Sequence, residues 1–229
     1  LPKDRLASDL YFNHPANLCF KLPENVSTLE GALIEPLAVG LHACELAGVK
    51  LGNTVVVFGA GCIGLVNMMA AKARGASTVI VIDIFDKRLE KAKELGANYV
   101  INSRNVDPVA EVWRLLGDGP DVILECAGAP IIVEQCCFMA KADTVIAFVS
   151  SMSGEYNYPT RAVMLKEVRT VMVFRYRNQY PIAIRAINEG RINISSIASN
   201  IYQFEDSLRA FDEALNNKMD VVKAVIAFD

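Results

Sequence analysis

The sequence lacks several features that mark specialised classes of protein. None of the apolar stretches in its 229 residues reaches the roughly 18 residues that a membrane-spanning helix requires. Charges of the two signs nearly balance, at a formal net charge of −3, and no basic patch or long run of like charge interrupts the chain. Internal repeats and low-complexity segments are missing too. These absences predict one large globular unit or somewhat more, with neither a nucleic acid nor a membrane as its partner.

Cysteines with the spacing of a metal site or a disulfide framework are lacking as well. No two cysteines form a C-x-x-C pair, and most of them lie within apolar runs. We therefore expect all of them to be small buried hydrophobic side chains in a reducing, cytoplasmic setting. The six are Cys19, Cys44, Cys62, Cys126, Cys136 and Cys137.

Residues 1–5 resemble no signal peptide or transit sequence, and the first residue is not methionine.

The chain is organised around one continuous stretch that starts with a short apolar run. This run, at 55–58, predicts a buried strand, because it is β-branched and too short for a helix. A G-x-G-x-x-G turn follows at 59–64, and a helical pattern then extends over 65–74. A second apolar run at 79–82 ends on Asp83. Strand, glycine turn, helix, strand and terminal acid in this order are the fingerprint of a dinucleotide-binding unit.

Each part of the fingerprint has a physical task. Gly59 permits the tight turn, Gly61 lets the backbone approach a pyrophosphate, and Gly64 lets the helix lie close to the strand. The start of the helix offers unpaired N–H groups and a partial positive charge to the phosphates. Asp83 would accept hydrogen bonds from the adenosine ribose, and its charge would repel a 2′-phosphate, which favours NAD over NADP.

Two other interpretations of this stretch stay open. A G-x-G-x-x-G sequence by itself is often a glycine-rich turn without a ligand, although here the surrounding elements all agree with the fingerprint. A methyltransferase with a similar first strand–helix–strand unit also fits, since it too can place an acid at the end of its second strand. Such an enzyme would bind S-adenosylmethionine instead of a dinucleotide.

Strands and helices alternate through the rest of the central region. Apolar runs follow at 99–101, 121–125, 144–149 and 171–174, and helical patterns lie between them at 86–95, 108–116 and 131–139. Such alternation predicts a parallel sheet with right-handed crossovers. Six strands make two mononucleotide-binding halves, for which the strand order 3-2-1-4-5-6 is expected. The predicted fold class is therefore α/β, a Rossmann doubly wound sheet.

The two ends of the chain do not fit into that sheet. Near the start we expect two short strands, at 10–12 and 18–22, which need further strands because an isolated pair is unstable. Near the end we expect helices at 181–189 and 204–216 and an apolar strand at 221–228. Both ends therefore predict partners outside the six-stranded core.

A helix that begins with the capping box Ser27-x-x-Glu30 carries Glu35 in an apolar run that contains proline. Burying an unpaired carboxylate is costly, so this acid is unusual. Either Glu35 is solvated near the helix N-terminus, where the helix dipole favours it, or it has a function. The same two interpretations apply to the polar cluster Arg175-Tyr176-Arg177-Asn178, which follows the sixth strand at the ligand-binding edge of the sheet.

Several phrases of the sequence together resemble the medium-chain, zinc-dependent dehydrogenase family, and within it the polyol branch of sorbitol and xylitol dehydrogenases. They are Phe20–Pro23, Glu30–Gly40, the glycine fingerprint, Glu125–Gly128 and Val173–Asn178. The resemblance covers nearly the whole chain from about Tyr11 onward.

The resemblance implies a domain organisation. In this family a GroES-like catalytic domain precedes the cofactor domain, and the chain returns to it at the end. Residues 1–35 would then be a remnant of the catalytic domain, 36–177 the NAD-binding Rossmann domain, and 178–229 the C-terminal return. The sequence would be N-terminally truncated, because the family's cysteine zinc ligand and its adjacent histidine–glutamate pair lie upstream of it. Relatives usually pair their cofactor domains edge to edge, which implies a homo-oligomer.

The resemblance also assigns residues to the cofactor. They are Gly59, Gly61, Cys62, Ile63, Gly64, Asp83, Arg88, Phe148, Val149, Ser150 and Phe174. The segment from Phe148 to Ser150 matches backbone at the nicotinamide, and Phe174 would face the same ring. Relatives usually have glycine where Val149 stands and often proline where Cys62 stands. The second change should matter little, because a backbone N–H contacts the phosphate.

Three further residues match the family's catalytic and substrate positions. Glu35 stands where alcohol dehydrogenases place a zinc-binding cysteine, and polyol dehydrogenases place a glutamate near the zinc-bound water or substrate. Arg175 and Tyr176 match residues that hold polyol hydroxyls. The implied activity is NAD-dependent, zinc-assisted oxidation of a polyol to a ketose by the full-length enzyme, and we expect this chain alone to be inactive. Two alternatives are an NAD-binding module without chemistry and a zinc-independent quinone or enone reductase that uses NADPH, against which Asp83 argues.

Overall fold

The computed structural model of the chain describes residues 13–152, 154–217 and 219–228, and a parallel sheet of six strands forms its centre. The strands are β1 (Thr54–Phe58), β2 (Thr78–Asp83), β3 (Tyr99–Asn102), β4 (Val122–Glu125), β5 (Val145–Phe148) and β6 (Arg169–Met172). Their order is β3-β2-β1-β4-β5-β6, and every neighbouring pair is parallel. The predicted Rossmann topology is confirmed, and its switch point lies between β1 and β4.

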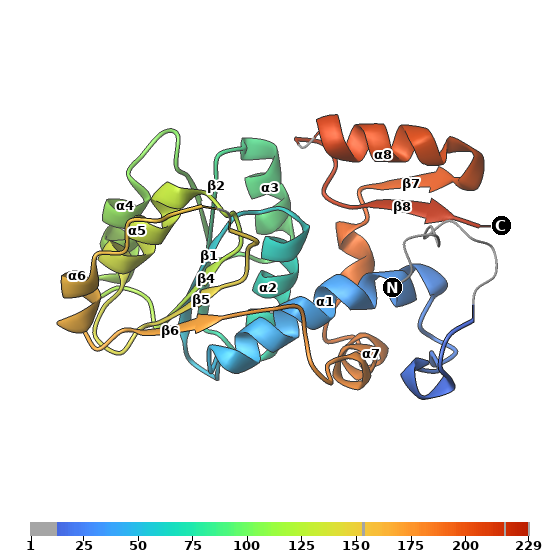
Figure 1. The fold of residues 1–229 in the computed structure, drawn as a ribbon, viewed down its shortest axis with the longest axis horizontal. Helices are drawn as coiled ribbons and strands as arrows, with labels where there is room; N and C mark the ends of the chain where they lie inside the picture. Colours follow the sequence, from blue (N-terminus) through green and yellow to red (C-terminus); the bar gives the residue numbers. More distant parts are fainter. Residues whose placement is uncertain (1–12, 153, 218, 229) are drawn as a thin grey trace.

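Helices cover both faces of this sheet (Figure 1). On one face lie α2 (Cys62–Ala73) and α3 (Asp86–Glu94), and on the other α4 (Pro108–Leu116), α5 (Pro130–Met139) and α6 (Thr160–Met164). Alternate residues of β1 face opposite ways, so Val55 and Val57 join the core beneath α2 while Val56 and Phe58 join the core beneath α5. Burial on both faces explains why these strands are continuous apolar runs.

Two further helices form a second layer on the α2 side. The first is α1 (Thr28–Leu46), which begins with the predicted capping box between Ser27 and Glu30, and the second is α7 (Tyr180–Asn188). Helix α1 packs against both α2 and α7. A Cβ at Gly40 of α1 would lie 2.6 Å from the carbonyl oxygen of Val66 in α2. The two helix backbones therefore approach so closely that a side chain at position 40 has no room.

The C-terminal part forms a small second sheet with its own helix, and Val222 and Val225 of this part pack against the main core (Figure 1). Strands β7 (Asn200–Gln203) and β8 (Ala224–Ala227) pair in parallel, and α8 (Ser207–Asn216) connects them. Short 3₁₀ turns precede β7 at Ile194–Ile197 and α8 at Phe204–Asp206. The helix and last strand were predicted here, whereas β7, and elsewhere in the chain α6, were missed.

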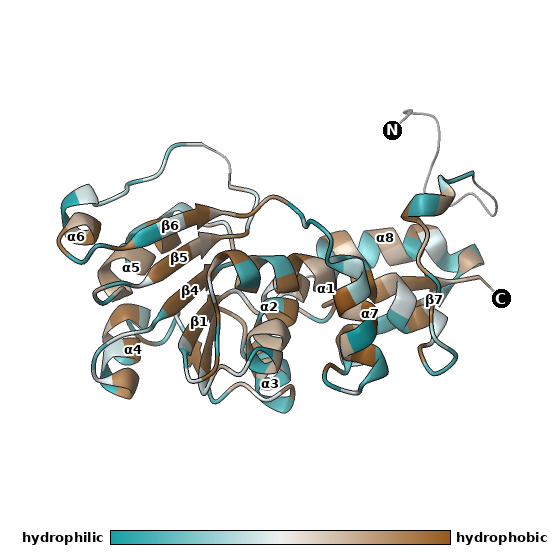
Figure 2. Ribbon diagram, turned by 90° about the horizontal axis from the view of Figure 1, so that it is seen from below, coloured by the Kyte–Doolittle hydropathy of each residue, from teal (hydrophilic) through white to brown (hydrophobic). Residues whose placement is uncertain are grey.

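Two predicted strands differ from the structure. Residues 18–22 form no strand: a 3₁₀ turn covers Ala16–Leu18 and the following residues are irregular, while the strand predicted at 10–12 lies outside the described residues. The sixth strand covers 169–172 instead of 171–174. It lies at the edge of the sheet, with β5 on one side and no described strand of the sheet on the other, so its residues are less buried than those of the central strands. A strand in this position can begin with the polar residues Arg169 and Thr170. Figure 2 shows β6 as partly hydrophilic beside the apolar β5 and β4.

The cysteines are free thiols, and most are shielded from water. Cys44, Cys136 and Cys137 are buried, and burial raises the thiol pKa of Cys44 to about 12 and that of Cys137 to about 11. Cys62 and Cys126 are half-buried, so the expectation of burial holds only in part for these two. Cys19 is exposed, and the expectation was wrong for it because its segment is an irregular stretch at the surface. The cytoplasmic location stays a prediction. Among the helices of the described part, none has the length and apolarity needed to cross a bilayer.

The close contact of α1 with α2 generates a prediction about stability. Gly40→Ala should lower the free energy of unfolding by about 1–3 kcal/mol, because the new methyl group meets backbone that cannot move aside. Urea unfolding followed by circular dichroism measures this change. Gly31→Ala in the same helix is the matched control, since its Cβ would meet the flexible end of Leu22 and alanine favours a helix by up to about 1 kcal/mol. Equal stability of the two variants would contradict the proposed contact.

Candidate functional site

The turn between β1 and α2 requires glycine at two positions. Gly59 has φ +94°, a left-handed conformation that favours glycine, and a Cβ at Gly64 would lie 1.8 Å from the carbonyl oxygen of Gly59. Helix α2 begins at Cys62, earlier than predicted, so Cys62, Ile63 and Gly64 form its first turn. Gly61 is the N-cap and no side chain caps the helix, which leaves the N–H groups of the first turn available to a ligand.

The Asp83 carboxylate is held firmly at the end of β2. One of its oxygens accepts hydrogen bonds from the N–H groups of Ile84 (2.7 Å) and Phe85 (3.0 Å). The other accepts from the N–H of Ala60 (2.6 Å) and lies 4.0 Å from a guanidinium nitrogen of Arg88. Asp83 thereby ties the glycine turn to the second strand. Each oxygen of a carboxylate has two lone pairs, so this acid can still accept hydrogen bonds from a ligand.

These parts surround a cleft of about 460 Å³ at the carboxyl ends of the strands. Its walls come from the turn after β1, the end of β2, the loop after β4 and the first turns of α3 and α5, and they include Gly59, Gly61, Asp83 and Arg88. The nearest atom to a Cβ at Gly61 would be a nitrogen of Arg88 at 3.7 Å, so the backbone there is open to the cleft. An uncapped helix N-terminus, a bare backbone and a fixed acid suit the pyrophosphate and adenosine ribose of a dinucleotide.

A buried glutamate that the sequence reasoning left without a role lies at the end of β4. Glu125 is 0 % exposed, and its carboxylate accepts hydrogen bonds from the N–H groups of Ala127 (2.8 Å) and Gly128 (2.7 Å) and from the Ser150 hydroxyl. A signal existed in the sequence, because Glu125 ends an apolar run just as Asp83 does. An acid in that position predicts a carboxylate at the ligand-binding edge of the sheet.

The segment expected at the nicotinamide follows β5. Phe148 points into the core beneath α5 and is 3 % exposed, whereas Val149 and Ser150 are half-buried. The N–H groups of Val149 and Ser150 donate to the backbone carbonyl of Glu125, at 2.8 and 3.1 Å. This places the segment beside β4 at the carboxyl edge of the sheet, on the other side of the switch point from Asp83.

The segment expected to hold substrate follows β6 and does not line the cleft. Phe174 is 83 % exposed, and the Arg175 guanidinium lies over its ring at 5.6 Å. The Tyr176 hydroxyl is 3.1 Å from the hydroxyl of Tyr180, whose ring stacks on Phe20 at 5.4 Å. Tyr180 is a second residue that the sequence reasoning missed.

Glu35 is exposed on α1, and its negative charge acts on two groups of other elements, the Cys62 thiol and the Tyr180 phenol. Burial chiefly raises the pKa of the Cys62 thiol, and the Glu35 carboxylate raises it further while Lys223 opposes this. Burial also raises the pKa of the Tyr180 phenol, with contributions from the hydrogen bond to Tyr176 and from Glu35. The structure thus brings Glu35 near the start of α2 and near the tyrosine pair.

A tightly bound zinc ion needs three or four ligands from cysteine, histidine or carboxylate side chains. Among the described residues, no group of three such side chains is close enough to hold a metal ion. Glu35 therefore lacks companions of this kind within the described part of the chain, and the residues present do not fit a zinc site on their own.

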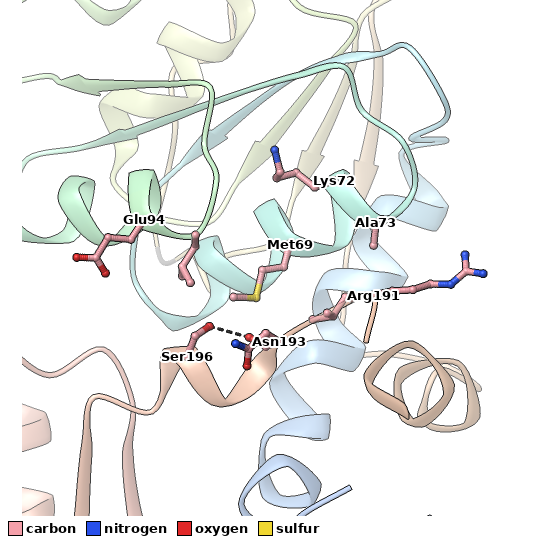
Figure 3. A pocket seen from close by; sticks show the side chains of 9 residues that line it. Met69, Lys72, Ala73, Glu94, Arg191, Asn193 and Ser196 are labelled. Carbon is pink, nitrogen blue, oxygen red and sulfur yellow. Dashed lines mark hydrogen bonds between the residues drawn. The ribbon is translucent and has the colours of Figure 1, made fainter. Parts of the chain in front are cut away.

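A second cavity, of about 370 Å³, shares no residue with the cleft. It lies between the ends of α2 and α3 and residues 191–196, where Ser196 donates a hydrogen bond to the Asn193 carbonyl. Figure 3 shows Lys72, Glu94 and Arg191 pointing in different directions. Its polar groups do not converge, so the first cleft is the candidate cofactor site.

Comparison with known proteins shows the family to which the chain belongs. The sequence pattern that defines the family described as zinc-binding dehydrogenase matches residues 62–189, more than half of the chain. The chain belongs to this family, the zinc-dependent medium-chain dehydrogenases. The prediction of the family from the sequence is confirmed, and family membership favours a dehydrogenase over the methyltransferase interpretation.

Two individual relatives show how similar the chain is to known members of the family. The chain is 40 % identical over 226 residues to the uncharacterized zinc-type alcohol dehydrogenase-like protein YdjJ of Escherichia coli K12, which covers 98 % of this chain and 65 % of that protein. It is 41 % identical over 205 residues to sorbitol dehydrogenase of Ovis aries, covering 88 % of this chain and 58 % of the sheep protein. The chain therefore spans less than two thirds of the length of these relatives.

A solved structure with cofactor has the same fold. It is an alcohol dehydrogenase of Escherichia coli CFT073 in complex with NADH, with a TM-score of 0.88 and 27 % identity over 94 % of this chain and 64 % of that one.

Proposed function

We propose that this chain provides the NAD(H)-binding part of a dehydrogenase that oxidises a polyol to a ketose. The observation that carries the cofactor proposal is the Asp83 carboxylate, fixed by three backbone N–H groups beside the glycine turn and the cleft. The pyrophosphate would lie at the first turn of α2, and the adenosine ribose would donate hydrogen bonds to Asp83. The NADH bound to the related Escherichia coli enzyme supports this proposal.

The same acid sets the choice between the two nicotinamide cofactors. A 2′-phosphate would bring at least one further negative charge against the buried, fixed carboxylate of Asp83, whereas a free 2′-hydroxyl would donate a hydrogen bond to it. We therefore expect NADH to bind more tightly than NADPH. This preference argues against the NADPH-dependent quinone or enone reductase.

Fluorescence titration of the chain with NADH and NADPH tests the cofactor proposal. Asp83→Asn should weaken NADH binding about tenfold or more and narrow the difference from NADPH, because a charged hydrogen-bond acceptor is lost. Asp86→Asn, at an exposed acid in the first turn of α3, is the matched control and should leave both affinities unchanged. Preferential NADPH binding by the wild-type chain, or binding of neither cofactor, would overturn the proposal.

The division into domains also stays a proposal: a catalytic-domain remnant at 1–35, the cofactor domain at 36–177 and a C-terminal return at 178–229. The first boundary falls within helix α1. The tail supports the idea of a return to another domain, because α8 exposes three large apolar side chains. They are Leu208 (87 % exposed), Phe211 (66 %) and Leu215 (68 %). Such a face is costly in water and is typical of a surface that contacts further protein.

In the full-length enzyme the substrate would lose a hydride from a carbinol carbon to C4 of the nicotinamide and a proton from its hydroxyl. The products would be a ketose, NADH and a proton. Arg175 and Tyr176 would orient the substrate hydroxyls, and Glu35 would act on the reacting hydroxyl or on a nearby water. Any zinc would need ligands from outside the described residues, so we expect the chain alone to bind NAD(H) without turnover. The similarity to sorbitol dehydrogenase supports the polyol as substrate class.

Steady-state kinetics of the full-length enzyme test these roles. Glu35→Gln should lower kcat, and Arg175→Ala should raise KM for polyols about tenfold or more, because hydrogen bonds from a charged group are lost. Arg177→Ala changes a neighbouring exposed arginine and should retain wild-type kinetics. If Glu35→Gln and Arg175→Ala both matched wild type, the assignment of these two residues would be wrong.

We also propose that two copies pair through the edge of the cofactor domain. Among the described residues, strand β6 has a neighbour on one side only, and Met172 at its end is 70 % exposed. An open sheet edge with an exposed apolar side chain can add the same strand of a second copy. Sedimentation analysis should give the mass of a dimer, and Met172→Lys should shift it toward the monomer. A wild-type monomer at all concentrations tested would contradict the pairing.

A further inference from the structure

Glu125 is a buried acid with no ionic partner among the described residues. The residue is 0 % exposed at the end of β4, and its carboxylate accepts hydrogen bonds from two backbone N–H groups and one hydroxyl. Burying a carboxylate is costly unless several donors satisfy it. A hydrophobic residue would be the simpler choice in that position, so the acid calls for an explanation beyond packing.

The hydrogen bonds of Glu125 join two loops. One carboxylate oxygen accepts from the N–H groups of Ala127 and Gly128, which lie in the loop after β4. The other oxygen accepts from the Ser150 hydroxyl, which lies after β5. The backbone carbonyl of Glu125 accepts from the N–H groups of Val149 and Ser150. One residue therefore fixes the exits of two neighbouring strands with five hydrogen bonds.

The loops are held close together at this point. Gly128 has φ +78°, and a Cβ there would lie 3.4 Å from the Cβ of Ser150. The loop after β4 also lines the cleft through Cys126, Ala127 and Ala129. A shift of this loop or of Ser150 would therefore change the shape of the cleft wall on the β4 side.

The position of this wall relative to Asp83 identifies what it contacts. In a doubly wound sheet each half binds one mononucleotide, and the two halves meet at the switch point. Asp83 belongs to the half that contains β1, β2 and β3, which would hold the adenosine. Glu125 and Ser150 belong to the half that contains β4, β5 and β6, which would hold the nicotinamide nucleotide.

We propose that Glu125 is a positioning residue for the nicotinamide half of the cofactor. It sets the separation of the β4 and β5 loops and the direction of the Ser150 segment, and the cofactor touches those loops instead of Glu125 itself. This inference rests on the proposed NAD(H) binding and assigns a second buried acid to it. Asp83 holds the adenosine side of the cleft and Glu125 the nicotinamide side.

The test compares two ligands that occupy different parts of the cleft. NADH occupies both halves, whereas 5′-AMP carries the adenosine half alone. Glu125→Ala should weaken NADH about tenfold or more, because three donors lose their acceptor, while AMP affinity should change less than about twofold. The fluorescence of the reduced nicotinamide, which reports the surroundings of that ring, should rise less on binding. Isothermal titration calorimetry supplies both affinities.

Further variants cover the risk that Glu125→Ala does not fold. Glu125→Gln retains an oxygen for Ala127 and Gly128 and a donor for Ser150, so it should restore most of the NADH affinity. Ser150→Ala removes the link to the β5 loop alone and should weaken NADH about threefold with AMP unchanged. Glu94→Gln, at an exposed glutamate at the end of α3, is the control and should bind both ligands as wild type does.

The outcomes distinguish this inference from the proposed function. If wild type binds NADH and AMP but Ser150→Ala and every folded Glu125 variant bind NADH as wild type does, the inference is wrong and the proposed function stands. If a variant loses AMP as much as NADH, Glu125 supports the fold in general and the inference is again overturned. If wild type binds neither ligand, the proposed function fails and the inference fails with it.

Discussion

The close approach of α2 to the end of β1 is the constraint on which the rest of the structure depends. At Gly64 the helix comes so near the carbonyl of Gly59 that no side chain could fit between them. This contact fixes where the first turn of α2 begins and hence where its free N–H groups lie. The neighbouring α1 also lies close to α2, because a Cβ at Gly40 would be 2.6 Å from the carbonyl oxygen of Val66. The cleft is therefore built on a rigid pair of elements before any polar side chain contributes.

Two buried acids then shape the cleft on either side of the switch point. Asp83 and Glu125 each end a strand of the sheet, and each accepts hydrogen bonds from three donors in the loops around it. A loop held by its backbone N–H groups cannot drift, because moving it would leave a buried carboxylate unsatisfied. The loops can thus be both irregular and well positioned, which a binding cleft for a flexible dinucleotide requires.

Much of this arrangement could be predicted from the sequence, with failures that have physical causes. The strand order was correct because the alternation of apolar runs and helical patterns along the chain predicts a doubly wound sheet. The second strand also ends on Asp83 as predicted, while the role of this acid toward a cofactor stays a prediction. The strand expected at 18–22 was wrong, since a short alternating run becomes a strand only where a partner strand is available. The edge strand β6 was displaced by two residues because exposure on one side relaxes the apolar pattern. Glu125 received no role because its partners come from loops that the sequence separates by up to 25 residues.

The sequence by itself determined the class of fold, the place of the glycine turn and the family, because hydrophobic period and glycine spacing act between neighbours along the chain. The tertiary structure decided which side chains meet. It placed Glu35 near Cys62 and Tyr180, joined Tyr176 to Tyr180 and tied Ser150 to Glu125. It also left the apolar face of α8 exposed, although its spacing alone predicts burial. Such contacts depend on how separate elements pack, and no local pattern encodes the distance between two elements.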